Sequence, residues 1–215
     1  MENQGKWLLH FMKMSAKSTE LNTAPLCIPV GNPVIAFLRP VAVQSSSLNP
    51  QDVALLTAWR NKYVTSFLTE FEATTEQTSA WLMDIVAKKD NKILFMLDNL
   101  QGQTFGYMGL DYINWETGYG EADAIVKGEE APKGVMTMSL ETLLAWGVSM
   151  LGLKELHVRV LEDNPALNFY KNMGFLPYKY MPLIEQKTAH QTTWVEMPIH
   201  TDSKRKLVYL QKKLG

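Results

Sequence analysis

Three strand-like segments follow one another between residues 92 and 126, and they constrain the fold more than any other feature. Before Lys92, apolar residues recur at helical spacing over 53–68 and 74–86. After it the spacing becomes that of β-strands, and KILFMLDN and TFGYMGLDYIN are joined by the hairpin-like turn NLQGQ. A third strand, EADAIV, follows. This half therefore predicts two helices followed by an antiparallel set of strands.

The second half of the chain alternates helix and strand. It predicts a helix over 135–153, a strand over 154–162, a short helix after Pro165, and two closing strands at 175–186 and 192–199. A strand–helix–strand unit of this kind forms a crossover between strands of one sheet. Together with a first strand at 34–43, this order predicts an α/β layered sheet.

Length and composition fit one folded domain with extensions. The chain has 215 residues, of which 46% are hydrophobic, and a formal net charge of −1, so composition gives no argument for a nucleic acid or an acidic membrane surface as partner. No apolar run approaches the ~20 residues of a membrane span. The single cysteine, Cys27, excludes an intrachain disulfide and fits a reducing compartment. We expect a cytoplasmic protein.

Three parts are expected along the chain. Residues 1–32 are polar and mixed and end in prolines and a glycine, so they predict an N-terminal extension. Residues 33–199 form the folded domain. Residues 200–215 carry five basic side chains and predict a solvated C-terminal tail.

Capping signals mark the predicted helix starts. Asn49 precedes Pro50 at the start of the first helix, and either Thr74 or Thr75 can cap the second. Neither signal depends on function.

The stretch LEDNPALNFYKNMGF (161–175) places a tyrosine inside a short helix with complete start and stop signals. Asn164 can cap the helix, Pro165 suits its first position, and Gly174 suits the residue after its end. The ring of Tyr170 can pack in the core, or its hydroxyl can emerge in a cleft for chemistry. Both readings stay open from these residues alone.

The loop VKGEEAPKGVMTMS (126–139) joins a strand to a helix start. The first N–H groups of a helix have no partner within the helix, so this junction can hold a phosphate, with Lys127 and Lys133 adding positive charge. It is not a nucleoside-triphosphatase loop, because the Gly-x-x-x-x-Gly-Lys-Ser/Thr pattern is absent. An ordinary connection is the alternative.

These features together resemble the GNAT superfamily of acyl-CoA-dependent N-acyltransferases, over about residues 34–198. VLEDNPALNFYKNMGF is similar to the family's Val-x-x-x-Asn…Ala-x-x-x-Tyr-x-x-x-Gly-Phe signature. The matching positions are Val160, Asn164, Ala166, Tyr170, Gly174 and Phe175. The resemblance implies a mixed, mostly antiparallel central sheet with helices on both faces. It also implies that Tyr170 is the general acid toward the departing thiolate.

Acetyl-CoA is the cosubstrate that the resemblance implies, with no metal. The strand EADAIV would pair its backbone with pantetheine at Ala124, Ile125 and Val126, and Asn164 would bond the pantetheine arm. The pyrophosphate loop would be GEEAPKGVM, with Lys133, Gly134 and Val135 as contacts.

Two departures from the family pattern affect these assignments. The loop usually reads Arg/Gln-x-x-Gly-x-Gly/Ala, and this chain retains only Gly134. Asn164 also precedes Ala166 by one residue fewer than is usual. An acyl-CoA-binding domain without turnover is therefore an alternative to an enzyme.

The chemistry also needs a base and an oxyanion donor. Glu121 and Asp123 alternate with alanines, so both carboxylates fall on one strand face, either beside the acyl group as the base or simply toward solvent. Asp111 is a third candidate for the base, and His157 is expected to be structural. The strand backbone near Ala124–Ile125 can supply the N–H donor for the oxyanion.

Trp59, Arg60 and Asn61 carry the prediction for the acceptor. LLTAWRNKYVTSFL followed by EQTSAWL looks like the branch that acetylates amino groups on nucleotide-linked sugars, in which such a sequence opens the substrate-side helices. We therefore expect a primary amine of a small molecule. An enzyme for protein or peptide N-termini is the alternative, and a homodimer is left open.

Overall fold

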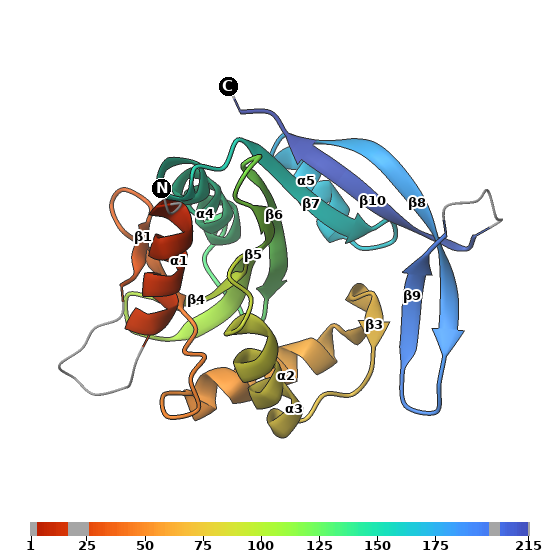
Figure 1. Cartoon of the computed structure of the whole chain (residues 1–215), viewed down its shortest axis with the longest axis horizontal. Helices are drawn as coiled ribbons and strands as arrows, with labels where there is room; N and C mark the ends of the chain where they lie inside the picture. Colours follow the sequence, from red (N-terminus) through yellow and green to blue (C-terminus); the bar gives the residue numbers. More distant parts are fainter. Residues whose placement is uncertain (1–3, 17–25, 198–202, 215) are drawn as a thin grey trace.

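The computed structural model describes residues 4–16, 26–197 and 203–214, and within them the chain forms one ten-stranded sheet with helices on both faces (Figure 1). The strand order is β1-β2-β4-β5-β6-β7-β10-β8-β9-β3. The strands are β1 (Ile28–Val30), β2 (Ala36–Pro40), β3 (Thr69–Glu70), β4 (Ile93–Asn99), β5 (Thr104–Asn114), β6 (Tyr119–Lys127), β7 (Glu155–Leu161), β8 (Phe175–Lys187), β9 (Thr192–Glu196) and β10 (Arg205–Lys212). The α-helices are α1 (Gln4–Ser15), α2 (Pro50–Lys62), α3 (Thr75–Trp81), α4 (Val135–Leu151) and α5 (Ala166–Asn172), with a short 3₁₀ helix η1 (Val64–Ser66) and a short π-helix η2 (Leu82–Val86). None of the helices in the described ranges is long and apolar enough to cross a membrane.

Neighbouring strands run antiparallel throughout the described sheet, except for β6 and β7. The chain passes from β6 to β7 through α4, and a helical crossover of this kind returns the chain in the same direction. The parallel register runs from Tyr119 opposite Glu155 to Ala122 opposite Val158 and stops there. The predicted mixed, mostly antiparallel α/β sheet is confirmed.

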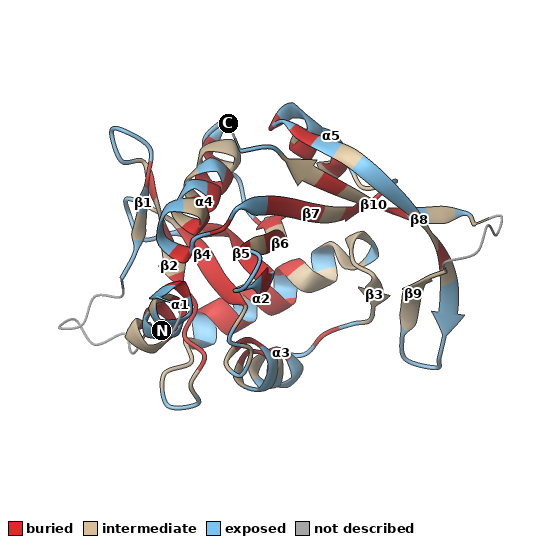
Figure 2. Cartoon of the chain, turned by 45° about the horizontal axis from the view of Figure 1, so that its top comes forward, coloured by how far each residue is buried: buried red, intermediate tan, exposed pale blue. Residues whose placement is uncertain are grey.

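Each face of the sheet has its own core. On one face, α1, α4 and α5 pack against residues such as Phe95, Met108 and Leu110. On the other, α2, α3 and η2 pack against the alternating positions, among them Met96 and Tyr107. Figure 2 shows the buried residues concentrated in the central strands between these two layers. The alternation of side chains along each strand thus divides the sheet into a face bearing α4 and a face bearing α2.

The helix boundaries follow the capping signals of the sequence. The Asn49 side chain accepts a hydrogen bond from the Gln51 amide at 2.9 Å, and Pro50 begins α2, as predicted. Of the two threonines considered for the next helix, Thr74 is the cap, in a reciprocal capping box with Gln77. Gly134 and Gly152, with φ of 83° and 74°, bound α4.

The prediction of a solvated tail at 200–215 is wrong for the part that the structure describes. Residues 205–212 form β10, which lies between β7 and β8 in the sheet. Leu207, Val208 and Leu210 of this strand are buried, at 2%, 0% and 0% exposure. The basic residues around them suggested a solvated segment. In the sheet, however, Leu207 lies on one face and Val208 and Leu210 on the other, and the burial of these apolar side chains stabilises the strand more than the neighbouring charges favour solvent.

The N-terminal extension is also part of the fold. Two elements lie within residues 1–32. Strand β1 pairs with β2, and helix α1 packs against α4. The two helix backbones approach so closely that a Cβ on Gly5 would lie 2.6 Å from the Leu151 carbonyl oxygen. The sheet therefore continues beyond both limits of the predicted 33–199 domain.

Lys13 attaches α1 to the opposite layer. Its Nζ donates to the carbonyl oxygens of Val86 at 2.7 Å and Lys89 at 2.5 Å, while the residue is only 6% exposed. Burial lowers the pKa of Lys13 from 10.5 to about 8, although Asp90 opposes the shift. Because the unfolded chain binds this proton more tightly, folding is disfavoured below pH 8 and the penalty disappears as pH rises toward 10.5.

Lys13→Met should abolish this pH dependence. The free energy of unfolding of the wild type should rise relative to that of the variant by about 1.4 kcal/mol for each pH unit between the folded and unfolded pKa values. Urea denaturation of both proteins from pH 7 to pH 10.5 measures the difference, with Lys88→Met, an exposed cation, as the control. Parallel stability curves for wild type and Lys13→Met would show that Lys13 titrates normally.

Candidate active site

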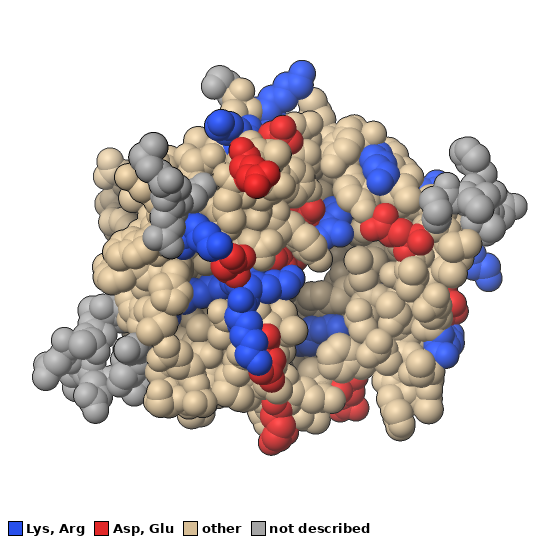
Figure 3. Space-filling model, in the orientation of Figure 1, with Lys and Arg blue, Asp and Glu red and all other residues tan. Residues whose placement is uncertain are grey.

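An opening between β6 and β7 is the central feature of the site. Their pairing ends at Ala122 and Val158, although β6 continues to Lys127 and β7 to Leu161. The backbone groups on this edge of β6 therefore have no partner in β7 beyond Ala122. In the orientation of Figure 1, the space-filling view shows a hollow at this opening, with basic and acidic side chains around it (Figure 3).

A bulge in β6 produces the opening. Tyr107 of β5 pairs with Val126, and Gly109 pairs with Asp123, so Ala124 and Ile125 share a single partner position. Ala124 has a φ of 52°, a left-handed conformation that alanine rarely adopts. An extra residue of this kind bends the strand and re-aims its side chains. The bend leaves Asp123 and the Ala124–Ile125 backbone at the opening.

The loop after β6 leads into an α4 start without a side-chain cap. Gly134 precedes the helix with a φ of 83°, and no side chain caps the first turn. A Cβ on Gly134 would meet nothing within 4 Å, so the backbone conformation rather than crowding requires glycine here. The Val135 amide donates to the Pro132 carbonyl oxygen at 3.2 Å, whereas the next amides of the first turn have no partner within the helix and remain available.

Helix α2 holds this loop in place. The Trp59 indole donates to Glu129 at 2.9 Å, Lys62 donates to the Gly128 carbonyl oxygen at 2.9 Å, and Tyr63 donates to the Lys127 carbonyl oxygen at 2.9 Å. A Cβ on Gly128 would lie 1.9 Å from the Trp59 ring, so glycine permits the close approach.

Tyr170 is both a core residue and an available donor. Its ring lies against Phe169 and Phe175, with centroids 5.4 Å and 6.1 Å away, and the residue is 5% exposed. Its hydroxyl makes no hydrogen bond to any described residue. Burial raises the pKa of Tyr170, and the charge of Asp123 raises it further, so the hydroxyl keeps its proton at neutral pH.

The helix that carries Tyr170 begins one residue later than the sequence signals suggest. Asn164 accepts a hydrogen bond from the Ala166 amide at 2.9 Å, and α5 starts at Ala166. Gly174 follows its end with a φ of 85°, as predicted. The Asn164 amide oxygen is thereby used within the turn, which leaves its NH₂ group for a ligand.

Lys92 links the carboxylates of two strands. The Lys92 ammonium lies 2.7 Å from Asp111 and 2.6 Å from Asp123. The side chains of Lys92 and Asp111 are 6% and 5% exposed, whereas that of Asp123 is 37% exposed. Burial alone would lower the pKa of Lys92, but Asp123 and Asp111 outweigh it and raise that pKa. Asp123 is therefore the member of this cluster that a substrate can reach.

Glu121 lies in a different set of contacts. It is 6% exposed and accepts hydrogen bonds from Arg159 at 2.6 Å and from the Tyr119 hydroxyl. Neither Glu121 nor Asp123 is thus a freely solvated carboxylate. His157 is 6% exposed and stacks on the Tyr119 ring at 4.4 Å, which fits the expected structural role.

The three residues predicted to bind the acceptor have different surroundings. Trp59 is 2% exposed and stacks on Tyr107 at 6.1 Å. Asn61 bonds both backbone groups of Ala73, donating to the carbonyl oxygen at 2.9 Å and accepting from the amide at 2.8 Å. Arg60 alone of the three has a buried side-chain nitrogen, Nη1, without a partner among the described residues. The prediction therefore rests on Arg60.

Tyr107 was not among the residues predicted from the sequence. It lies on the α2 face of β5, where burial raises its pKa, and Arg60 and Asp123 act on that pKa in opposite directions. The signal was present in TFGYMGLD, where strand alternation places Tyr107 on the same face as Asp111. Tyr107 thus lies within electrostatic reach of both charged groups.

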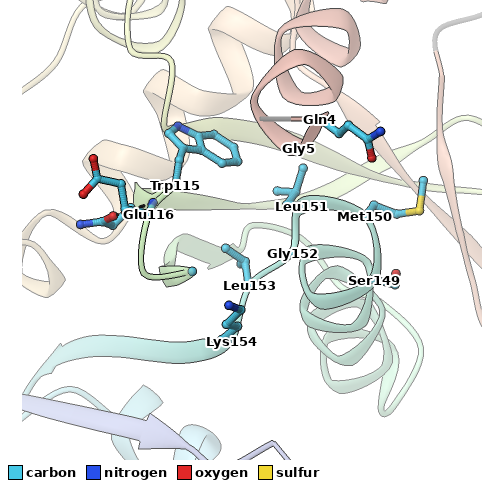
Figure 4. A pocket seen from close by; sticks show the side chains of 12 residues that line it. Gln4, Gly5, Trp115, Glu116, Ser149, Met150, Leu151, Gly152, Leu153 and Lys154 are labelled. Carbon is cyan, nitrogen blue, oxygen red and sulfur yellow. Dashed lines mark hydrogen bonds between the residues drawn. The ribbon is translucent and has the colours of Figure 1, made fainter. Parts of the chain in front are cut away.

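Two crevices are present besides the opening. One, of about 400 Å³, is enclosed by α1, the β5–β6 turn and the C-terminal end of α4, with Trp115 and Leu151 facing each other across it (Figure 4). The other, of about 560 Å³, lies between the end of α2, β3 and the β8–β9 hairpin. Among the described residues, no cluster of His, Cys, Asp or Glu has the arrangement to hold a metal ion.

Known acetyltransferases share this fold. An acetyltransferase from Salmonella typhimurium that modifies the N-terminal serine of a 50S ribosomal subunit protein has a TM-score of 0.66 at 13% identity, covering 88% of this chain and all (100%) of the other. A probable GNAT-family acetyltransferase from Chromobacterium violaceum has a TM-score of 0.64 at 13% identity, covering 92% and 88%. The spermidine/spermine N-acetyltransferase from Vibrio cholerae has a TM-score of 0.57 at 16% identity, covering 82% and 91%.

Sequence comparison reaches the family level. Among curated proteins, no sequence matches this chain. A protein-family model described as "Acetyltransferase (GNAT) domain" matches residues 46–175, which include the bulged strand, the loop before α4 and the helix of Tyr170. The chain belongs to the GNAT family of acetyltransferases.

Proposed function

We propose that the protein transfers an acetyl group from acetyl-CoA to a primary amine of a small molecule. The observation that carries this proposal is the opening where the pairing of β6 and β7 ends, with Asp123 beside it and Tyr170 close enough for the charge of Asp123 to raise the pKa of its hydroxyl. One residue comes from the α4 face and the other from the sheet itself. An acetyl-CoA titration combined with a thiol-release assay over a panel of amines tests the proposal, and saturable binding without thiol release would leave an acyl-CoA-binding domain.

The residues around the opening fit coenzyme A. On the edge of β6 that faces β7, the backbone of Ala124, Ile125 and Val126 has no strand partner and can bond an amide-containing arm, and the NH₂ group of Asn164 can do the same. The Gly134 amide, the later amides of the first α4 turn and the charge of Lys133 can bind the pyrophosphate at the start of α4, and the Val135 amide can join them once it releases the Pro132 carbonyl oxygen. When bound, acetyl-CoA supplies an acetyl group activated as a thioester.

Tyr170 supplies a proton donor at the opening. Its raised pKa keeps the hydroxyl protonated, and its packed ring fixes the direction of that hydroxyl. A group of this kind can protonate a departing thiolate, because its hydroxyl is already held in position before the reaction begins.

Asp123 is the better supported of the two predicted bases. An ammonium must lose a proton before it becomes a nucleophile, and a carboxylate can take it directly or through water. Asp123 is accessible and is held by Lys92, whereas Glu121 is buried and occupied by Arg159 and Tyr119.

A small acceptor is favoured by a bridge across the substrate side. Strand β3, after α2, pairs with β9 at Thr69–Thr193 and Glu70–Thr192. The Trp194 amide also donates to the Leu68 carbonyl oxygen at 2.7 Å. This bridge spans the groove that a protein N-terminus would need between the first helices and the last hairpin, and it leaves a cleft of about 560 Å³ beside it. A nucleotide-linked amino sugar remains our narrower candidate, and cytoplasmic location and homodimer formation remain expectations.

Gly134→Ala should weaken acetyl-CoA binding severalfold. Alanine in a left-handed conformation costs about 1–2 kcal/mol, and relaxing it would re-aim the first amides of α4. Calorimetry measures the dissociation constant. The matched control is Gly102→Ala, because Gly102 also has a positive φ (77°) and open space but lies in the β4–β5 turn. Equal affinities in the two variants would remove the loop from the site.

Tyr170→Phe should reduce turnover by about ten- to a thousandfold, because it removes the donor and keeps the ring packing. Stability and acetyl-CoA affinity should change little. Steady-state kinetics with the best amine of the panel measures the effect. Full turnover in the variant would make water the acid, and loss of folding would favour a purely structural tyrosine.

Asp123→Asn and Glu121→Gln should separate the two carboxylates. Asp123→Asn should lower kcat by about a hundredfold, in the range of one acid–base group. Glu121→Gln should keep kcat within a few fold and lower stability by about 1–3 kcal/mol, because it weakens the contact with Arg159. The reverse pattern, with the larger loss of kcat in Glu121→Gln, would assign the base to Glu121.

A further inference from the structure

Arg60 differs from the other arginines of the chain in lacking a carboxylate partner. Arg39 pairs with Asp52 and Asp98, Arg159 pairs with Glu121, and Arg205 pairs with Glu70 and Asp163, all at 3.0 Å or less. No described carboxylate lies within ion-pair distance of Arg60. Its charge therefore has no direct counterion in the described part of the chain.

The surroundings of Arg60 make this lack costly. The guanidinium stacks on Phe67 at 4.1 Å and on Phe71 at 4.7 Å, and its Nη2 donates to the Thr69 carbonyl oxygen. Its Nη1 is buried and has no hydrogen-bond partner among the described residues. Burial lowers the pKa of Arg60, which reflects the same desolvation. Stacking on aromatic rings and one hydrogen bond compensate the desolvation of this half-buried cation only in part.

Arg60 lies on the acceptor side of the site. Its neighbour Trp59 stacks on Tyr107 of β5 at 6.1 Å, and both Tyr107 and Glu70 lie close enough to raise the pKa of Arg60. The neighbours Asn61 and Phe71 line the cleft of about 560 Å³ between α2, β3 and the β8–β9 hairpin. Arg60 does not itself line the cleft but stacks on Phe71, which does, so an anion in the cleft can reach the guanidinium only if this ring moves.

Most carboxylates on this side are already bound. Asp123 and Glu121 have the partners described above. Glu70 accepts hydrogen bonds from Arg205 at 3.0 Å and from the Trp194 indole at 2.6 Å. Glu196 accepts a hydrogen bond from the Tyr209 hydroxyl at 2.5 Å. Glu72, at the wall of the cleft, is exposed to solvent. A second ammonium on the acceptor would thus find no buried carboxylate ready for it, whereas an anion would find Arg60.

We infer that the acceptor carries an anionic group, a carboxylate or a phosphate, in addition to the amine, and that Arg60 binds this group. The inference rests on the proposed N-acetyltransferase function and narrows its substrate class. A planar guanidinium forms paired hydrogen bonds to either anion. Polyamines, which bear only cationic groups, are correspondingly disfavoured for this chain, in contrast to the acceptor named for the Vibrio cholerae enzyme.

Matched amines test the inference through kcat/KM. To test for a phosphate, kcat/KM for glucosamine 6-phosphate is compared with that for glucosamine. To test for a carboxylate, 4-aminobutyrate is compared with 1-aminobutane. The diamine 1,4-diaminobutane represents the polyamines. We expect the anionic member of at least one pair to be preferred by tenfold or more, and the pair showing the preference identifies the anion. A preference for 1,4-diaminobutane, or equal rates within both pairs, would overturn the inference.

Arg60 variants test the role of the side chain. Arg60→Met should remove the preference by raising KM for the anionic amine at least tenfold, with the uncharged amine and the acetyl-CoA affinity unchanged. Arg60→Lys should retain part of it, because the charge remains but the paired geometry is lost. Lys88→Met, which removes an exposed cation, is the control. An unchanged preference in Arg60→Met would exclude Arg60.

A binding measurement separates this inference from the proposed function. If no amine is acetylated, the proposed function fails. The shift of the unfolding temperature in the presence of coenzyme A still measures whether the anionic compounds bind at Arg60. Stabilisation of the wild type by glucosamine 6-phosphate or 4-aminobutyrate, lost in Arg60→Met, would support Arg60 as an anion site. Stabilisation by 1,4-diaminobutane alone, or by none of the three at saturating concentration, would overturn it. If Arg60→Met does not fold, the comparison uses Arg60→Lys.

Discussion

One extra residue in β6 sets the geometry on which the site depends. Ala124 takes a φ of 52° between the pairs Tyr107–Val126 and Gly109–Asp123. A non-glycine residue in this conformation costs about 1–2 kcal/mol, so the pairing on both sides must hold it. In return the strand turns away from β7 after Ala122, which leaves backbone groups free for a ligand. A regular strand would stay paired with β7 and would have no such edge.

The charges near the bulge are arranged so that few are buried alone. Lys92, just before β4, reaches Asp111 on β5 and Asp123 on β6, so one ammonium joins three successive strands. Removing one member of a buried set like this typically costs several kcal/mol, because the remaining charge is left without a partner. Lys13 on α1 lies in the field of the same cluster, since both Lys92 and Asp111 act on its pKa. The N-terminal helix is therefore electrostatically connected to the candidate site.

Local signals predicted most of the helices and strands, and long-range pairing accounts for what was missed. The caps at Asn49 and Thr74 and the glycines at 134 and 174 act over a few residues, so they are legible in the sequence. The place of β10 between β7 and β8 depends on contacts across the whole chain, and its lysines suggested a tail instead. For the site, the strand face of Glu121 and Asp123 follows from alternation. Their different partners are Lys92, just before β4, and Arg159 of β7, and these depend on which distant segments flank β6, which alternation does not reveal.

The strand that resembled a tail also connects the two sides of the site. Arg205 at the start of β10 contacts Asp163 at 3.0 Å, in the turn that leads to α5 and Tyr170. The same guanidinium contacts Glu70 of β3 at 3.0 Å and the Thr65 carbonyl oxygen at 2.6 Å, both on the acceptor side. A planar guanidinium fixes its partners in a defined geometry. The helix that presents the proposed acid and the segment that spans the acceptor groove therefore share one anchor. A displacement of β3 by a bulky acceptor would strain the turn before α5, which gives a physical reason for the site to select small acceptors.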